Sequence, residues 1–129
     1  MKLGDDGYCF VCGDKNPIGL KLRFIPEGRD IRAEFTASKN HQGYKDIVHG
    51  GIVSTLLDEA MVKLAISMGI MAVTGRMEIR FRNPLMVGER ALLAARLIKE
   101  GKRFIEVEAS LSKADNVIIA EATGILIKT

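Results

Sequence analysis

Apolar and polar residues follow a strand-like pattern through most of the second half of the chain. The strand-like runs occupy residues 76–82, 91–99, 105–112 and 117–128. In the first run, Met77, Ile79 and Phe81 are separated by charged residues. A period of two places successive side chains on opposite faces of a strand, and short polar turns between such runs are typical of hairpins. The pattern predicts four strands, the later ones joined as antiparallel hairpins.

Two shorter runs of the same kind lie nearer the N-terminus. They span residues 20–24 and 31–35, with an apolar residue at every second position. Pro26-Glu27-Gly28 between them is a turn signal, so we expect a hairpin. Residues 1–19 and 36–48 are turn-rich or polar and are expected to be irregular.

One helix is predicted, over residues 50–68. Its apolar positions are Ile52, Val53, Leu56, Leu57, Ala60, Met61, Leu64, Ala65 and Met68. A helix that is apolar nearly all round is a buried one, and only Glu59, Lys63 and Ser67, at i, i+4 spacing, leave a narrow polar stripe. We therefore expect an α+β domain in which a curved antiparallel sheet wraps around one long central helix. The apolar surface left over predicts an obligate homo-oligomer.

Length and composition fit one globular domain over residues 1–129, with 47% hydrophobic and 27% charged residues. The net charge of +3, without basic patches that contain aromatic residues, argues against nucleic acid as a partner. No apolar leader begins the chain, and Asp58, Glu59 and Lys63 interrupt the longest apolar stretch. We therefore expect a cytoplasmic protein that does not enter a membrane.

The two cysteines form Cys9-Phe10-Val11-Cys12-Gly13. Two cysteines separated by two residues make half of a tetrahedral zinc site. His41 or a second subunit could supply further ligands, but the spacing shows no second half. A pair of reduced thiols in a turn-rich segment is therefore the favoured interpretation, and no metal or other cofactor is expected.

Asp58 is the most unusual residue of the predicted helix. Glu59 has Lys63 one turn away, which predicts an ordinary surface ion pair, whereas no cation lies three or four residues from Asp58. A carboxylate on a buried helix is costly unless it is hydrogen-bonded. Asp58 is therefore either bonded by Ser54, Thr55 or nearby backbone, or it serves as a general base or nucleophile.

His49-Gly50-Gly51 opens the same helix. The first N–H groups of a helix lack partners and carry a partial positive charge, and glycines leave them open to a ligand. Such groups can stabilise an oxyanion, although a plain turn into a helix would look the same. Because Asp58 lies about 10–13 Å further along the axis, one helix cannot present both groups to one carbonyl. The arrangement predicts a site shared between two subunits.

These segments together resemble the hotdog-fold acyl-CoA thioesterases of phenylacetate and hydroxybenzoate degradation. The similarity covers nearly the whole chain. It is carried by Cys-x-x-Cys-Gly with Asn-Pro-x-Gly-Leu (residues 9–20), by His49-Gly50-Gly51 with Asp58, and by the run from Thr74 to Pro84. The resemblance implies a hotdog fold and hydrolysis of an aryl or short- to medium-chain acyl-CoA to the free acid and coenzyme A. It also implies a homo-oligomer that is a dimer or a dimer of dimers.

The resemblance also implies roles for single residues. Asp58 falls at the catalytic carboxylate, and Gly50 at the backbone N–H that polarises the thioester carbonyl. His49 falls at the residue that shapes the turn, and Thr74 at a hydroxyl that holds the water or the carboxylate.

Where such enzymes often carry the Asn or Gln that orients the water, this chain has Gly43. Either the adjacent Gln42 takes that role, or the activity is slower or differently tuned. Gln42, Gly43 and Gly51 are accordingly counted among the candidate substrate-binding residues.

Basic residues of the same run are candidates for the phosphates of coenzyme A. Arg76, Arg80 and Arg82 could bind them, or could instead pair across strands with Glu106 and Glu108.

Two other functions stay open on the sequence. One is a non-catalytic acyl-CoA-binding module. The other is an enoyl-thioester hydratase or dehydratase of the same fold, for which His41 would be the candidate histidine.

Overall fold

The computed structural model describes residues 2–129. The predicted helix, α1, runs from Gly50 to Ser67, and Met68 follows it as the C-terminal cap. The six strands are β1 (Ile25–Glu27), β2 (Asp30–Thr36), β3 (Ala72–Phe81), β4 (Arg90–Glu100), β5 (Phe104–Lys113) and β6 (Val117–Lys128). Two single turns of 3-10 helix, η1 (Lys39–His41) and η2 (Ala114–Asn116), precede α1 and β6.

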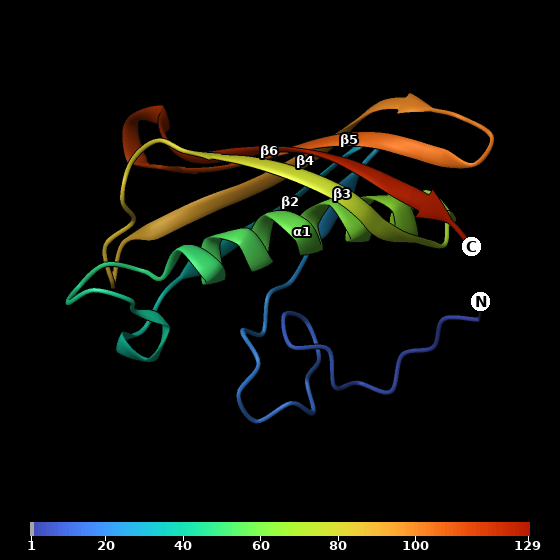
Figure 1. Ribbon diagram of the computed structural model, residues 1–129. Coiled ribbons are helices and arrows are strands. Elements are labelled where there is room, and N and C mark those ends of the chain that lie inside the picture. Colours follow the sequence, from blue (N-terminus) through green and yellow to red (C-terminus); the bar gives the residue numbers. More distant parts are fainter. Residues whose placement is uncertain (1) are drawn as a thin grey trace.

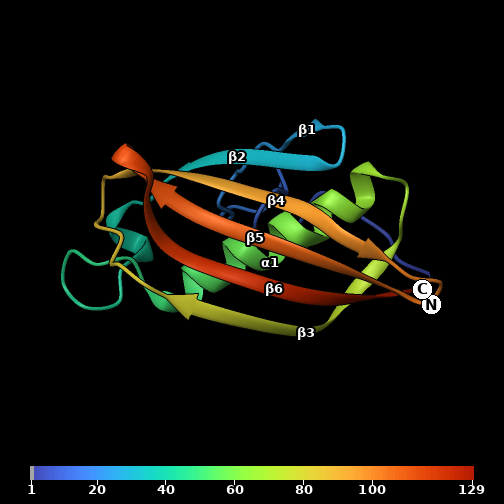
Figure 2. The same ribbon diagram turned by 90° about the horizontal axis from the view of Figure 1, so that it is seen from above.

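All six strands form one antiparallel sheet in the order β1-β2-β4-β5-β6-β3. The sheet curves along one side of α1 (Figure 1), and the helix lies beneath its central strands when it is seen from above (Figure 2). The predicted fold class, a curved antiparallel sheet around one long helix, is confirmed.

The helix is buried as its sequence pattern predicts. Seven of its residues are buried: Val53, Leu56, Leu57, Ala60, Met61, Leu64 and Ala65. Ile52 and Met68, also predicted to be apolar contacts, are half-buried. Alternate residues of the strands fill the space against the helix, and many of them are alanine, such as Ala95, Ala109 and Ala122. Small side chains let a helix lie close to the sheet.

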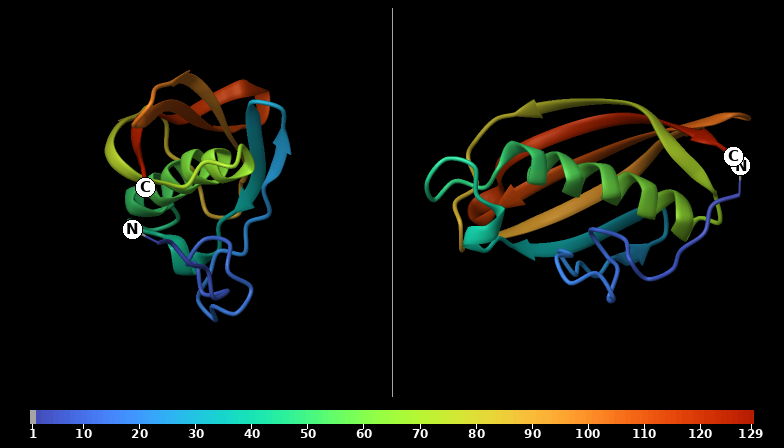
Figure 3. Two further views of the ribbon diagram at one scale, coloured as in Figure 1. Left: turned by 90° about the vertical axis from the view of Figure 1, so that its right-hand side faces the viewer. Right: turned by 60° about the horizontal axis from the view of Figure 1, so that its bottom comes forward.

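The N-terminal segment, residues 2–24, covers the side of α1 that faces away from the sheet (Figure 3). Val11 and Leu22 of this segment are buried, at 4% and 5% exposure, as part of the core. Part of the apolar helix surface that the sequence assigns to a second subunit is therefore covered by the chain itself.

The strand predicted at 20–24 is wrong. Lys21 adopts a left-handed conformation, with φ of 59°, which breaks an extended run. Its ammonium group donates hydrogen bonds to the carbonyl oxygens of Gly13, Asp14 and Asn16 at 3.1, 2.6 and 2.7 Å. The apolar alternation there reflects packing against the core, as the burial of Leu22 shows.

The predicted hairpin exists, but it begins later than expected. Ile25–Glu27, which includes two residues assigned to the turn, forms β1 and pairs with β2. The reversal occurs at Gly28 and Arg29 instead.

A β-bulge in β3 decides which residues face the helix. The register with β6 shifts between Thr74 and Arg76, so Gly75 is the extra residue. A bulge reverses the alternation of faces, and both Thr74 and Met77 therefore face α1. A Cβ at Gly75 would lie 2.8 Å from Ile127 Cγ1, so this close approach requires glycine.

Within residues 2–129, no helix has both the length and the apolar character that crossing a membrane requires.

Candidate active site

Asp58 lies on the part of α1 that faces β3. It is half-buried, and its Oδ1 accepts a hydrogen bond of 2.5 Å from the Thr74 hydroxyl. Ser54 and Thr55, the sequence-based alternatives, donate instead to the carbonyl oxygens of Gly50 and Gly51. Among the described residues no cation pairs with Asp58. A carboxylate held by one hydroxyl and not neutralised keeps an oxygen available to accept a proton.

The N-terminus of α1 presents an unused backbone donor. His49 is the N-cap residue, and its Nδ1 accepts a hydrogen bond of 2.7 Å from the Gly51 N–H. The Gly50 N–H has no acceptor within residues 2–129. Gly50 is exposed, so a ligand oxygen can approach this N–H directly. Gly51, in contrast, has already donated its N–H to the cap.

The loop before the helix packs around His49. The His49 N–H donates to the His41 carbonyl oxygen at 2.8 Å, and a Cβ at Gly43 would lie 3.2 Å from His49 Cδ2. Gln42 accepts a hydrogen bond from the Asp46 N–H through its Oε1 at 3.1 Å. The structure thus places Gln42 and Gly43 beside the helix N-terminus.

His41 has a structural position in this chain. Its Nδ1 accepts a hydrogen bond of 3.0 Å from the Ser38 N–H, and its ring lies 5.6 Å from that of Phe35. Neither Asp58 nor the two cysteines contact it. This placement does not support His41 as a metal ligand or as the histidine of a hydratase.

Asp58 and Gly50 are not brought together within one chain. They are eight residues apart on the same straight helix, which is roughly 12 Å along its axis. The two groups therefore form two candidate half-sites, one beside Thr74 and the other beside Phe81. The aromatic ring of Phe81 lies 3.7 Å from the position that a Cβ on Gly50 would occupy.

A hollow of about 300 Å³ adjoins the Gly50 half-site. Its lining is mostly apolar and comprises Ile47, Val48, Gly50, Val53, Phe81, Arg82, Asn83, Pro84, Leu85 and Ile119. Leu57 and Met61 are fully buried in the core and do not line this hollow, whereas Phe81 does.

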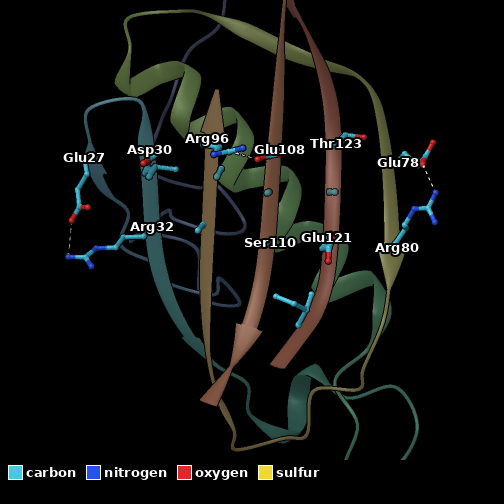
Figure 4. A pocket seen from close by; sticks show the side chains of 16 residues that line it. Glu27, Asp30, Arg32, Glu78, Arg80, Arg96, Glu108, Ser110, Glu121 and Thr123 are labelled. Atoms are coloured by element: carbon cyan, nitrogen blue, oxygen red, sulfur yellow. Dashed lines mark hydrogen bonds and ion pairs between the residues drawn. The ribbon is translucent and has the colours of Figure 1, made fainter. Parts of the chain in front are cut away.

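A second, larger hollow, of about 540 Å³, lies on the opposite face of the sheet from the helix (Figure 4). Arg80 is the one predicted site residue that lines it. Other charged side chains that line this hollow form ion pairs with each other: Arg32 with Glu27 at 2.9 Å, and Arg96 with Glu108. Asp58, Thr74 and Gly50 are absent from its lining, so volume alone does not locate the candidate chemistry.

The predicted cross-strand partners of the β3 arginines are wrong. β3 pairs with β6 and not with β5, so Glu106 and Glu108 lie out of reach. Arg82 pairs with Glu121 at 3.1 Å instead, and Arg80 approaches Glu78 at 3.9 Å. Arg76 is exposed and has no ion pair among the described residues.

A second polar cluster joins the N-terminal segment to α1. Cys9 Sγ donates a hydrogen bond of 3.1 Å to Glu59 Oε2, and Lys63 lies close enough to the Cys12 thiol to act on its pKa. Glu59 and Lys63 do not form the predicted ion pair within residues 2–129. Sequence reasoning missed this cluster, although two cysteines three apart and a Glu–Lys pair four apart offered a signal.

The cluster is polar yet partly shielded from solvent. Burial raises the pKa of the Cys12 thiol from its ordinary 9.0 to about 11, against the opposing effect of Lys63. Burial lowers the pKa of Lys63, but its hydrogen bond with Cys12 and the charge of Glu59 outweigh this and leave that pKa above its ordinary value. The ammonium group therefore stays charged beside the two thiols.

Comparison with known sequences identifies a family match and a set of relatives. Residues 45–120 match the family model of the thioesterase superfamily. Human acyl-coenzyme A thioesterase 13 is 29% identical over 94 residues, which make up 70% of this chain and 67% of the relative.

Solved structures share the fold. The smu.793 protein of Streptococcus mutans UA159, bound to acetyl CoA, superposes with a TM-score of 0.79 at 22% identity, covering 84% of this chain and 88% of that one. A hypothetical thioesterase protein of Streptococcus pneumoniae TIGR4, solved as a threonine-to-alanine mutant, gives 0.79 at 15% identity and covers 84% of this chain and 89% of that one. An aspartate-to-alanine mutant of the same protein gives 0.80 at 15% identity, with coverages of 84% and 90%. The substituted aspartate and threonine are 16 positions apart.

The role of His49 as the N-cap residue of α1 can be tested by its effect on stability. His49→Ala removes the acceptor of the Gly51 N–H, and we expect the free energy of unfolding to fall by about 0.5–2 kcal/mol. His49→Asn supplies an oxygen acceptor at the cap and is expected to retain most of the stability. Chemical denaturation of the three proteins measures this, and equal losses in both variants would contradict a capping role.

Proposed function

The chain belongs to the thioesterase superfamily, and we propose that it hydrolyses an acyl-coenzyme A thioester to the free acid and coenzyme A. The similarity to human acyl-coenzyme A thioesterase 13 and to the acetyl-CoA-bound Streptococcus mutans protein supports coenzyme A as the carrier. The apolar hollow beside Gly50 supports an aryl or short- to medium-chain acyl group.

One observation carries the proposal: the half-buried Asp58 carboxylate is held by Thr74 and is not neutralised by a cation. A carboxylate kept in this way is suited to act as a base or a nucleophile. Asp58 and Thr74 are 16 positions apart, the same separation as the aspartate and threonine replaced in the Streptococcus pneumoniae protein.

In the proposed reaction, Asp58 promotes attack on the thioester carbonyl carbon in one of two ways. As a base, it takes a proton from water while the water oxygen bonds to that carbon. As a nucleophile, it forms a mixed anhydride that water then hydrolyses. In both cases the C–S bond breaks, the sulfur leaves with the electron pair and is protonated, and the free acid forms.

The Gly50 N–H is the proposed donor to the carbonyl oxygen as negative charge develops on it. A backbone N–H at a helix N-terminus is fixed in place and gains from the helix dipole. It needs no reorganisation, because no other acceptor competes for it in the described chain. His49 fixes the turn that presents this N–H, and Gln42 is the residue proposed to orient water there.

The two half-sites are proposed to meet across a dimer. β3 is an edge strand of ten residues, and an unpaired edge of this length is ready to add another strand. Thr74 and Phe81 lie toward opposite ends of β3 and both face α1. Antiparallel pairing with β3 of a second copy, about a two-fold axis near the middle of the strand, would put the Thr74 end of one strand beside the Phe81 end of the other.

Coenzyme A phosphates are proposed to lie against the arginines of the same edge. Arg76 is the strongest candidate of the three, since Arg80 and Arg82 already have carboxylate neighbours. A guanidinium group without a partner can bind phosphate without first breaking an ion pair.

Replacing Asp58 by asparagine should remove activity without changing the fold. We expect kcat/KM to fall by about 10²–10⁴-fold because the amide can neither accept the proton nor attack the carbon. Thiol release from a panel of aryl and aliphatic acyl-CoAs measures this. Asp115→Asn makes the same chemical change at an exposed turn and should act as wild type.

Wild-type turnover in Asp58→Asn would refute the assignment of this carboxylate. Binding of coenzyme A by the wild-type protein without turnover of any acyl-CoA in the panel would instead favour a binding module.

The backbone donor can be tested by a proline. Gly50→Pro removes the N–H at the first helical position, where proline is well tolerated, and the preceding His49, with φ of −59° and ψ of 135°, already has the conformation that proline requires. We expect kcat to fall by roughly 10²–10³-fold. Gly50→Ala keeps the N–H, and its Cβ would lie at an ordinary 3.7 Å from Phe81, so most activity should remain. Equal activity of the two variants would exclude this donor.

Mixing the two inactive variants tests the shared site. In a hybrid of Asp58→Asn with Gly50→Pro, one site contains both defects and the other contains neither. Random exchange of subunits should therefore restore about one quarter of the wild-type sites. Thiol release after co-refolding of equal amounts measures the recovery. If each site lies within one chain, the mixture stays inactive.

A further inference from the structure

The cluster between the N-terminal segment and α1 has no part in the proposed hydrolysis. Glu59 follows Asp58 on the helix, and successive helical residues point about 100° apart. Asp58 therefore faces β3, whereas Glu59 faces the N-terminal segment and contacts Cys9. The two carboxylates therefore lie in different environments.

Three possible metal ligands converge in this cluster. One ligand atom each from Cys9, Cys12 and Glu59 lies within 4.8 Å of the other two, and all three residues are half-buried. Ligands that share one ion with bond lengths of about 2.0–2.3 Å stand at such separations. The sequence contains no further cysteine pair to complete a zinc site. Glu59, on the helix, offers one of the missing ligands.

We propose that Cys9, Cys12 and Glu59 bind one divalent transition-metal ion of the zinc type, which fastens the N-terminal segment to α1. Thiolate and carboxylate are ligands that Zn²⁺ accepts in tetrahedral sites, with a fourth position left for water. Binding replaces the two thiol protons, which pass to solvent.

The backbone already holds the two cysteines in position. The Gly13 N–H donates to the Cys9 carbonyl oxygen at 2.9 Å, which closes the turn between them. A Cβ at Gly13 would lie 2.4 Å from the Cys9 nitrogen and 2.5 Å from the Gly7 carbonyl oxygen. This turn therefore requires glycine, and its close packing fixes the spacing of the sulfur atoms before any ion binds.

Charge also fits an ion at this place. Two thiolates and one carboxylate around a divalent cation leave one net negative charge, in a partly buried position. Lys63, which lies beside Cys12, supplies the compensating positive charge. Groups that contact the ligands of a metal ion commonly orient them and balance their charge. Lys63 is thus a positioning residue and not a ligand.

The test uses the full chain, reduced with a non-thiol reductant and stripped with a chelator. Titration with Co²⁺ should give thiolate-to-cobalt charge-transfer absorption that saturates at one ion per chain, and Zn²⁺ should displace it. Zn²⁺ should also raise the melting temperature, because binding to the folded state alone stabilises it.

Variants assign the ligands. Cys9→Ser and Cys12→Ser should lose the charge-transfer band, and Glu59→Gln should weaken binding at least about 10-fold. Glu106→Gln makes the same change outside the cluster and should bind as wild type. Asp58→Asn should also bind the ion fully, so failure of the catalytic proposal would not affect this one.

The proposal is overturned if reduced wild-type protein takes up less than one ion per chain at saturation. It is equally overturned if Cys9→Ser and Cys12→Ser together retain the cobalt spectrum, or if the reduced cysteines only form a disulfide on exposure to air and never bind the ion. The wild-type titration does not depend on the folding of any variant. Its result therefore decides whether the cluster binds an ion.

Discussion

α1 is apolar almost all the way round, so every polar side chain on it must find a partner inside the fold. The sheet covers one side, and residues 2–24 cover the opposite one. A polar group held between two such layers is costly unless it is hydrogen-bonded. Asp58 is bonded by Thr74, and Glu59 by Cys9. Both clusters that carry chemistry arise from this single requirement of a helix packed on two sides.

Sequence periodicity predicted the helix and the four strands that follow it, because the apolar pattern of each long element records its own burial. It failed at residues 20–24, where the left-handed conformation of Lys21 and its three carbonyl contacts decide the structure. It also paired Glu59 with Lys63, because helical spacing contains no information about a distant segment. The N-terminal segment, whose Cys9 donates a hydrogen bond to Glu59, reaches the helix only through tertiary contacts.

In the candidate site, too, local sequence predicted some features, and tertiary contacts decided the others. The unusual status of Asp58 was visible because no cation lies within one turn of it. Its partner on β3 depends on the bulge at Gly75, since without the extra residue Thr74 and Met77 could not share a face. Local sequence did not indicate that bulge, and the position of Thr74 followed from the family resemblance. The structure supplies a physical reason for glycine at the bulge, which is the close approach of Ile127 to position 75.

The two candidate half-sites on α1 differ in what they already bind. The one at the middle of the helix holds a carboxylate with a partner, Thr74, whereas the one at Gly50 holds a donor with none among the described residues. A buried donor without an acceptor would be destabilising, but this one is exposed beside an apolar hollow and an unpaired strand edge. Such a donor costs little while water solvates it, and it gains an acceptor when a carbonyl oxygen arrives. In the proposed dimer, the free edge of β3 is therefore where a second copy would bring the Thr74 end of its own β3, with Asp58, toward this donor.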